Sequence, residues 1–279
     1  MARKASKKIV FVILDGAADR PSKELGNKTP FEIAFKPNLD YLCYKGKTGM
    51  HYPIKKGIAP ESDSAVMALL GYDPYSYFTG RGPLEAYGAG IAFKRGDLVL
   101  RTNFASMHKN KIIDRRVGRS LTTEEARILA KFINKKLKLS FPFKFEPTIQ
   151  HRGILVVKGS FSENISNSDP GYKRKGKFAV AVKGKRELIL SKPLDDDEIS
   201  LLSANIVNHF VEQSHKLLKN HPINIKRIKN GLLPANVILT RDAGISLPLI
   251  PKKVQKWLAI LGMPLEKGIA KLAGMDILP

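Results

Sequence analysis

The chain has 279 residues, of which 43% are hydrophobic and 26% are charged, and its formal net charge is +23. This length suits one large domain or two ordinary ones, and no apolar run reaches the ~18 residues that a membrane-spanning helix needs, so we expect no membrane partner. The single cysteine, Cys43, argues against a disulfide-stapled secreted protein and indicates a cytoplasmic one, with Cys43 as a core thiol. The basic excess favours anionic ligands, but the lysine clusters carry no nucleic-acid motif, so nucleic acid is not expected as a partner.

The first predicted element is a buried strand. Ile9 to Leu14 form a continuous apolar run, which is typical of a strand buried on both faces of a parallel sheet. The run ends at Asp15-Gly16, and in open α/β sheets ligands gather at the carboxyl ends of the strands. Asp15 is therefore a candidate ligand for a hard metal ion, although a turn aspartate explains this stretch equally well.

A helix N-terminus carrying two serines is predicted further along the chain. Thr29-Pro30 marks an earlier helix over 30–44, and an extended piece over 47–54 leads to Glu61-Ser62-Asp63-Ser64. The apolar run that follows predicts a helix over 63–71, so Ser62 or Ser64 lies where free backbone N–H groups favour an anion. A serine that only caps the helix is the alternative.

The pattern changes after a glycine-rich stretch, Gly80 to Gly90, that predicts a loop. From about residue 96 onwards the periodicities alternate between those of strands and those of helices. Strands are predicted over 98–104, 111–114, 143–149, 153–157 and 178–182, and helices over 121–137 and 197–219. A buried strand over 236–239, which ends at Thr240-Arg241, is expected to return to the first sheet, and a helix follows over 252–262.

A series of short motifs, in this order, resembles the archaeal-type cofactor-independent phosphoglycerate mutases of the alkaline phosphatase superfamily. The motifs are Asp15-Gly16, Thr29-Pro30, Pro37-Asn38-Leu39-Asp40, Glu61-Ser62-Asp63, Leu70-Gly71-Tyr72-Asp73-Pro74, Thr79-Gly80-Arg81-Gly82-Pro83-Leu84-Glu85-Ala86, Arg101-Thr102-Asn103-Phe104-Ala105, Ile113-Asp114-Arg115-Arg116-Val117-Gly118-Arg119, His151-Arg152-Gly153, Ser168-Asp169-Pro170, Leu233-Pro234-Ala235-Asn236 and Ala273-Gly274-Met275. Each motif alone is weak, but together they span almost the whole chain.

The resemblance implies an α/β fold with an alkaline-phosphatase-like doubly wound sheet and an inserted α+β domain. It implies a discontinuous metal and nucleophile domain over 1–95 and 235–279, and an inserted substrate-binding domain over 96–234. Members of that family continue past the point that matches Pro279, and their remaining segment completes a site for two divalent metal ions, Mn²⁺ or Mg²⁺. We therefore expect this sheet and this metal site to be incomplete, and a complementary C-terminal polypeptide as a possible partner.

By the same resemblance, Ser62 is the nucleophile that becomes transiently phosphorylated, and Asp15 and Ser62 are this chain's share of the metal ligands. Glu61 stands where the family usually has glycine, and its carboxylate would repel phosphate if it points inward. The substrate would be phosphoglycerate, whose phosphate and carboxylate both suit the planar fork of arginine. The candidate substrate-binding residues are Asp114, Arg115, Arg116, Arg119, His151, Arg152 and Arg241. Surface salt bridges for the arginines, and a structural role for His151, are the alternatives.

Three functions remain open from the sequence. The first is a mutase of glycolysis and gluconeogenesis that interconverts 2- and 3-phosphoglycerate through a phosphoserine, working with a separate C-terminal chain. The second is a related metal-dependent phosphatase or hydrolase. The third is a non-catalytic remnant that keeps the anion-binding cleft.

Overall fold

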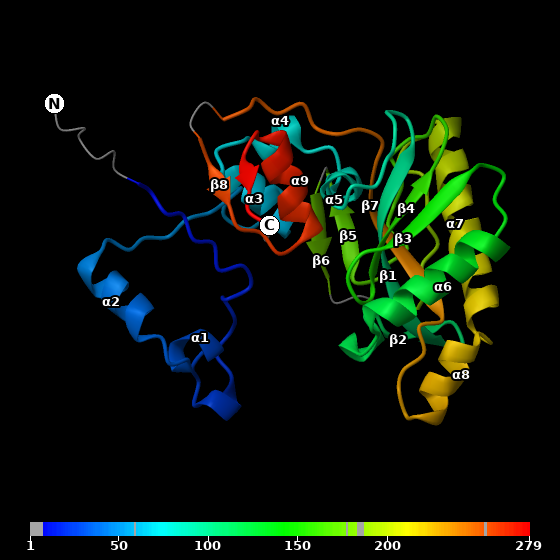
Figure 1. Ribbon diagram of the computed structural model, residues 1–279, viewed down its shortest axis with the longest axis horizontal. Coiled ribbons are helices and arrows are strands. Elements are labelled where there is room, and N and C mark those ends of the chain that lie inside the picture. The colour runs from blue at the N-terminus through cyan, green and yellow to red at the C-terminus, as the bar shows by residue number, and fades with distance from the viewer. Residues whose placement is uncertain (1–7, 59, 177, 183–186, 254–255) are drawn as a thin grey trace. The chain divides into compact units, whose positions relative to one another are not determined.

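The computed structural model describes residues 8–58, 60–176, 178–182, 187–253 and 256–279. The chain divides into two compact units, Met1–Tyr52 and Pro53–Pro279, which are described separately (Figure 1). In the described part of the chain, no helix is long and apolar enough to cross a membrane.

The first unit has little structure that buries side chains. It contains η1 (Lys23–Leu25), α1 (Pro30–Ile33) and α2 (Pro37–Lys45), and none of its described residues is buried. Thr29 caps α1 through a capping box with Glu32, as Thr29-Pro30 predicted, but the predicted helix over 30–44 is broken into α1 and α2. The predicted core position of Cys43 is wrong, because its side chain is exposed on α2.

The predicted buried strand over 8–14 is also wrong for the residues described. Ile9 to Leu14 are in irregular backbone and exposed, with Ile9 at 91% exposure, and no extended strand forms over 47–54. A strand needs a hydrogen-bonded neighbour, and the described residues of this unit offer none to the run at 9–14.

The second unit is built on a five-stranded antiparallel sheet. Its strands are β1 (Leu98–His108), β2 (Lys111–Asp114), β3 (Phe143–Pro147), β4 (Arg152–Val157) and β7 (Val237–Gly244). Their order is β2-β1-β4-β3, and β7 also pairs with β1. The mixed α/β class is confirmed, but this sheet is antiparallel, and the strand over 236–239 joins β1 rather than a sheet of the N-terminal run.

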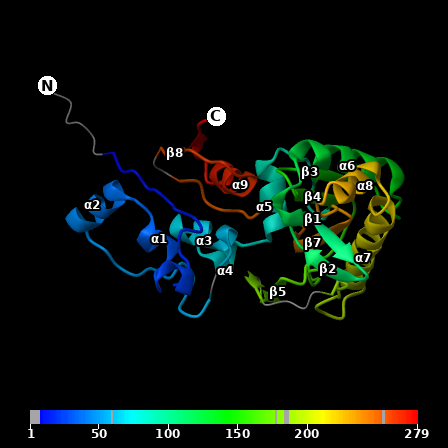
Figure 2. The same ribbon diagram turned by 90° about the horizontal axis from the view of Figure 1, so that it is seen from below.

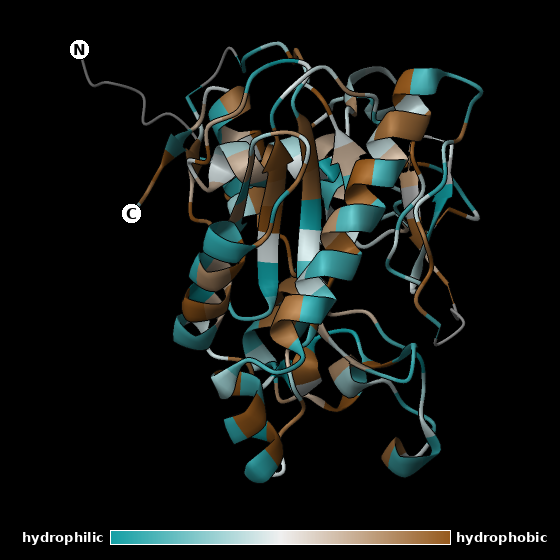
Figure 3. Ribbon diagram, turned by 90° about the vertical axis from the view of Figure 1, so that its right-hand side faces the viewer, coloured by the Kyte–Doolittle hydropathy of each residue, from teal (hydrophilic) through white to brown (hydrophobic). Residues whose placement is uncertain are grey.

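Helices cover both faces of this sheet. One face packs on α6 (Thr123–Lys136) and α7 (Glu198–Leu218), and the other on α5 (Arg81–Gly88), an arrangement seen in two views (Figures 1 and 2). Because side chains alternate along a strand, Leu98 and Leu100 of β1 face α6 and α7, whereas Val99 faces α5. Figure 3 shows the hydrophilic and hydrophobic bands that alternate along the helices, as expected when only one face is buried.

Smaller elements complete the unit around α5. A second core joins α3 (Ser62–Leu69), α4 (Pro74–Tyr77), α5 and α9 (Pro264–Leu272), and Phe178 enters it from the hairpin of β5 (Tyr172–Lys175) and β6 (Phe178–Ala181). The remaining elements are η2 (Val117–Arg119), α8 (Pro222–Lys229), β8 (Leu258–Ala259) and β9 (Asp276–Ile277). The predicted helix over 252–262 is wrong where described, because residues 258–259 pair in parallel with 276–277.

Candidate active site

The predicted helix N-terminus at the two serines is present. Ser62 is the first residue of α3, preceded by Glu61 in extended backbone (φ −78°, ψ 166°). Ser62 is half-buried, whereas Ser64 is buried and donates its hydroxyl to the Glu61 carbonyl at 3.3 Å. The backbone N–H groups of the first turn of α3 therefore surround Ser62, the more accessible of the two hydroxyls.

A chain of alternating charges lies beside this helix end. Glu61 accepts hydrogen bonds from Arg81 at 3.2 Å and from Arg241 at 2.8 Å. Arg81 also bonds Glu85 at 2.7 Å, and the Nε of Arg101 lies 3.3 Å from the same carboxylate. Each side chain of the chain Arg241–Glu61–Arg81–Glu85–Arg101 is at most 11% exposed. The Glu61 carboxylate thus points toward two arginines, the inward orientation that the sequence left open.

Charge compensation keeps Glu85 ionised. Burial raises the pKa of Glu85, but the charges of Arg101 and Arg81 outweigh it, so this pKa lies below its ordinary value. Burial lowers the pKa of Arg101 to about 10, against the opposing charge of Glu85. Burial likewise raises the pKa values of Asp63 and Asp242, which favours their neutral forms. Arg81, Arg101 and Arg241 therefore share their surroundings with the carboxylates of Glu61, Glu85, Asp63 and Asp242, and burial favours the neutral form of the last two.

The arginine motif at 114–119 forms a tight loop at one end of β2. Asp114 accepts hydrogen bonds from the backbone N–H groups of Arg116 at 2.7 Å and Gly118 at 2.8 Å. Val117, Gly118 and Arg119 all have left-handed backbone, with φ of 55°, 59° and 56°. Asp114 therefore stabilises the loop that carries the arginines.

The arginines of this loop converge on His151. Burial, together with the charges of Arg152, Arg116, Arg101 and Arg119, lowers the pKa of His151 to about 4. The His151 side chain is 3% exposed. Sequence positions 101, 116, 119, 151 and 152 therefore meet at one place, and Arg81 connects it to the helix end, since its charge also acts on Arg152.

Several buried side-chain nitrogens of this cluster have no hydrogen-bond partner among the residues described. They include the Nδ1 of His151 and the Nε atoms of Arg152 and Arg241, the last of which lies 3.6 Å from Asp242. Buried polar atoms are nearly always paired in folded proteins, so unpaired nitrogens that gather in one place indicate a ligand site. Because the guanidinium groups among them are cationic, the arrangement suits an anion with several oxygens.

Sequence reasoning missed four members of this site: Arg81, Glu85, Arg101 and Tyr172. Arg101 had a usable signal, because a charged residue stands inside an otherwise buried strand and its alternation places it with Val99 on the side of α5. Tyr172 had none, since its partner Arg241 is 69 positions away in sequence. Its ring lies 3.6 Å from the guanidinium carbon of Arg241 and 4.6 Å from that of Arg115.

The predicted metal ligands do not form a complete site. The described residues contain no group of three or more His, Cys, Asp or Glu side chains that could hold a metal ion. Asp15 lies in a turn of the first unit, and Ser62 belongs to the second. The residues described here therefore do not fit a two-metal centre on their own, and no reaction step is assigned to a metal.

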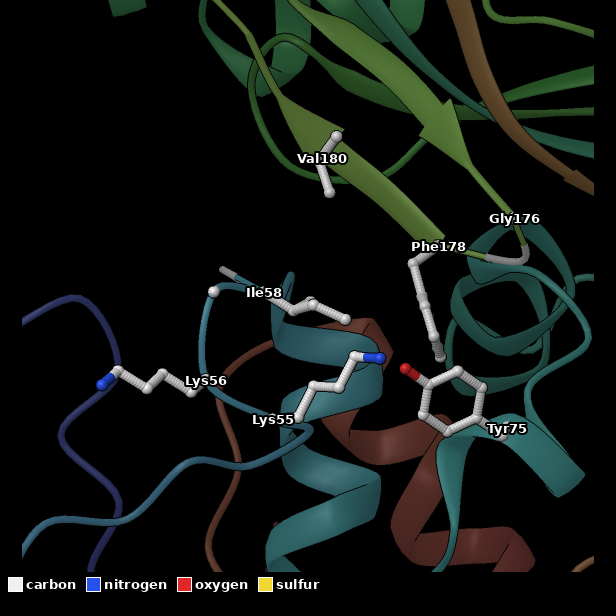
Figure 4. Close-up of a pocket in the computed structure, with 8 residues that line it drawn as sticks. Lys55, Lys56, Ile58, Tyr75, Gly176, Phe178 and Val180 are labelled. Carbon is white, nitrogen blue, oxygen red and sulfur yellow. The ribbon is translucent and has the colours of Figure 1, made fainter.

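A separate pocket lies near the start of α3 (Figure 4). Its volume is about 340 Å³, and its lining includes Lys55, Ile58, Tyr75, Phe178 and Val180. In the close-up, the ammonium group of Lys55 and the ring of Phe178 both point toward Tyr75. None of the clustered arginines lines it, so this pocket is distinct from the arginine site.

Comparisons with known proteins agree on one family. The model of the 2,3-bisphosphoglycerate-independent phosphoglycerate mutases matches residues 44–224. Proteins of that name from Aeropyrum pernix and Methanosphaera stadtmanae are 44% and 45% identical, over 96% and 97% of this chain. The cofactor-independent phosphoglycerate mutase of Thermoplasma acidophilum is similar in structure, with a TM-score of 0.54, 37% identity, and coverage of 94% of this chain and 68% of that one.

The match covers only part of these relatives. The chain spans 66% of the Aeropyrum protein and 64% of the Methanosphaera protein. A solved protein from Pyrococcus horikoshii is similar in structure, with a TM-score of 0.62 and 30% identity. That match includes 95% of this chain but only 59% of the Pyrococcus protein. Identity at this level across nearly the whole chain leaves one assignment. The chain belongs to the family of 2,3-bisphosphoglycerate-independent phosphoglycerate mutases.

Proposed function

We propose that the chain provides the nucleophile and the anion-binding arginines of an enzyme that interconverts 3-phosphoglycerate and 2-phosphoglycerate. The observation that supports this most is the convergence of distant arginines beside the N-terminus that holds Ser62. A substrate with a phosphate at one end and a carboxylate at the other needs two cationic positions. The group around His151 and the group around Glu61 supply them.

In this proposal the oxygen of Ser62 attacks the phosphorus of 3-phosphoglycerate as its hydroxyl proton leaves, the bond from phosphorus to the 3-oxygen breaks, and the released 3-oxygen takes up a proton. The phosphoryl group then rests on Ser62 while glycerate stays bound by the arginines, and its 2-hydroxyl takes the phosphoryl group back. Arg116, Arg119, Arg152 and Arg241 would pair the anionic oxygens, and Arg115 would act beside Arg241. His151 is neutral at pH 7, so its imidazole could accept the proton of a glycerate hydroxyl.

We propose further that Asp15 and Ser62 are this chain's share of a site for two divalent metal ions, Mn²⁺ or Mg²⁺. The remaining ligands would come from a segment equivalent to the part of the relatives that this chain does not match. That segment would also cover the exposed run Ile9 to Leu14. The predicted division into 1–95 with 235–279 and 96–234, the alkaline-phosphatase-like arrangement and a cytoplasmic location belong to the same proposal.

The test compares Ser62→Ala with Ser64→Ala. Each is assayed for conversion of 3-phosphoglycerate with Mn²⁺, alone and with the C-terminal third of the Aeropyrum relative added as a separate polypeptide. We expect Ser62→Ala to abolish turnover and the phosphoserine signal in ³¹P NMR, and Ser64→Ala to keep most of both. Full activity of Ser62→Ala would refute the assignment of the nucleophile, and binding of 3-phosphoglycerate without turnover in any mixture would favour the non-catalytic alternative.

A further inference from the structure

Tyr172 contacts two arginines that come from distant parts of the chain. It is the first residue of β5, at the end of the segment Asp169–Tyr172 (Figure 1). The guanidinium carbon of Arg241 lies 3.6 Å from the centre of its ring, and that of Arg115 lies 4.6 Å away. Both distances are well within the ~6 Å range of cation–π attraction.

The same segment fixes Arg115 along its edge. Asp169 accepts from the Nε of Arg115 at 2.5 Å and from its Nη2 at 2.7 Å. Gly171 leaves the space that the guanidinium fills, since a Cβ there would lie 2.2 Å from the guanidinium carbon. Asp169 therefore holds the edge of the Arg115 guanidinium, and the ring of Tyr172 contacts its face. Gly171, which has no side chain, leaves room for this guanidinium.

Arg241 is held differently. One of its terminal nitrogens, Nη1, bonds Glu61 at 2.8 Å, and its Nε lies 3.6 Å from the buried carboxylate of Asp242 without a hydrogen bond. Its side chain is 4% exposed, so water does little to orient it. Two carboxylates thus lie along the edge of this guanidinium with one hydrogen bond between them and it, and the ring of Tyr172 adds the contact that fixes its plane.

An aromatic ring orients a guanidinium without cancelling its charge. Glu61 and Asp242 already lie along the edge of Arg241, and a further carboxylate in the place of the ring would also hold Arg241, but it would neutralise more of the charge and repel an incoming anion. The effect is mutual: burial raises the pKa of Tyr172, yet the charge of Arg241, and a hydrogen bond and the charge of Arg115, bring it below its ordinary value. The ring therefore lies in the field of both cations.

We infer that Tyr172 is a positioning residue that holds Arg241 and Arg115 in one orientation, with their charge available to an anionic group of the ligand. The identity of that ligand as phosphoglycerate rests on the proposed function, whereas the ordering of the two arginines does not. The aromatic ring is the part that acts, and the hydroxyl contributes only to Arg115.

The test uses Tyr172→Ala, which removes the ring, and Tyr172→Phe, which keeps it. The matched control is Tyr87→Ala, because Lys271 lies 5.6 Å from the Tyr87 ring in a pair outside the arginine cluster. Two quantities are measured on the full chain, with circular dichroism to confirm folding. One is the order of the arginine Nε–H groups by ¹⁵N relaxation, and the other is the affinity for 3-phosphoglycerate and for inorganic phosphate by calorimetry.

We expect Tyr172→Ala to disorder the Nε–H groups of Arg241 and Arg115 and to weaken 3-phosphoglycerate binding about tenfold, the size of a partly buried cation–π contact. Tyr172→Phe should keep the order and bind within about threefold of the parent. Tyr87→Ala should change neither quantity.

Unchanged order and affinity in Tyr172→Ala would overturn the inference, and so would an equal loss in Tyr172→Phe, since the ring would then not be the cause. If the parent chain binds neither ligand while Tyr172→Ala still disorders the two arginines, the positioning stands and the proposed substrate fails. The two ideas can thus fail separately.

Discussion

Removing the charge of Glu85 should destabilise the protein strongly. Its side chain is 5% exposed and lies 2.7 Å from Arg81 and 3.3 Å from Arg101, which are themselves 10% and 7% exposed. Glu85→Gln keeps the size of the side chain but leaves two buried guanidiniums facing a neutral amide. Breaking a buried ion pair from one side costs about 3–5 kcal/mol. Because an amide oxygen can still accept from Arg81, we expect the lower end, about 3 kcal/mol.

That loss is measurable as a shift of the thermal midpoint. In domains of about this size, 1 kcal/mol corresponds to roughly 2–4 °C, so the expected fall in Tm is about 6–12 °C by calorimetry. Glu124→Gln is the control, because Glu124 pairs with Arg127 at 3.4 Å with both side chains more than 60% exposed, and such pairs contribute at most ~1 kcal/mol.

A double variant distinguishes the effect of an unpaired buried charge from the effect of lost side-chain packing. Glu85→Gln with Arg101→Met removes the cation whose ion pair the single change abolishes, whereas Arg81 keeps its bond to Glu61. We therefore expect the double variant to be more stable than the sum of its two single variants predicts. A Tm fall in Glu85→Gln no larger than that of Glu124→Gln would refute the view that Glu85 compensates these arginines.

Three further predictions concern other parts of the same unit. Glu61→Gln removes a carboxylate that bonds Arg81 and Arg241 and competes with an anionic ligand for them. The affinity for 3-phosphoglycerate, measured by calorimetry, should therefore rise several-fold. An unchanged Kd would show that Glu61 does not compete with the ligand. His151 has a pKa of about 4 in the folded state and roughly 6.5 when unfolded, so its contribution to stability is complete above pH ~6.5 and is lost as the pH falls toward 4. The free energy of unfolding of His151→Asn, measured in urea, should therefore depend less on pH over this interval. An identical pH dependence in the parent and the variant would contradict this prediction. Gly88→Ala should lower the free energy of unfolding by about 2 kcal/mol or more, because a Cβ there would lie 1.7 Å from the Pro264 carbonyl oxygen. Gly262→Ala is the control and should be close to neutral, because a Cβ there would have nothing within 4 Å. Equal Tm values for the two variants would show that α5 and α9 can move apart freely.

The elements predicted correctly are those whose signals are local. The helix predicted over 121–137 is α6, which begins at a capping box between Thr122 and Glu125. The helix predicted over 197–219 is α7, which Asp197 caps. The strands predicted over 98–104 and 111–114 are β1 and β2, and Lys109 and Asn110, both with left-handed backbone, form the turn between them.

The glycine-rich stretch shows how a local rule can mislead. Gly80 to Gly90 predicted a loop, yet residues 81–88 form α5. Its glycines serve close packing: a Cβ on Gly82 would lie 2.3 Å from the Val99 carbonyl, and one on Gly88 would meet α9. Glycine here allows a helix to approach a strand on one side and another helix on the other. Sequence composition alone cannot distinguish that use of glycine from a flexible turn.

In the candidate site too, some residues are indicated by local motifs and others are brought together only by the fold. The arginines at 115, 116, 119, 152 and 241 could be named from their motifs, because a cluster of cations with few carboxylates indicates an anion. Their compensation could not, since Glu61 bonds Arg241 across 180 positions and Tyr172 contacts Arg115 and Arg241 from a separate hairpin. Motifs therefore indicate which charges are candidates for binding a ligand, whereas only the fold determines which of those charges are already compensated. Arg81, held between Glu61 and Glu85, is largely compensated, and Arg152, with its Nε unpaired among the described residues, is not. Substitutions at Arg81 should accordingly act first on stability, and those at Arg152 first on ligand affinity.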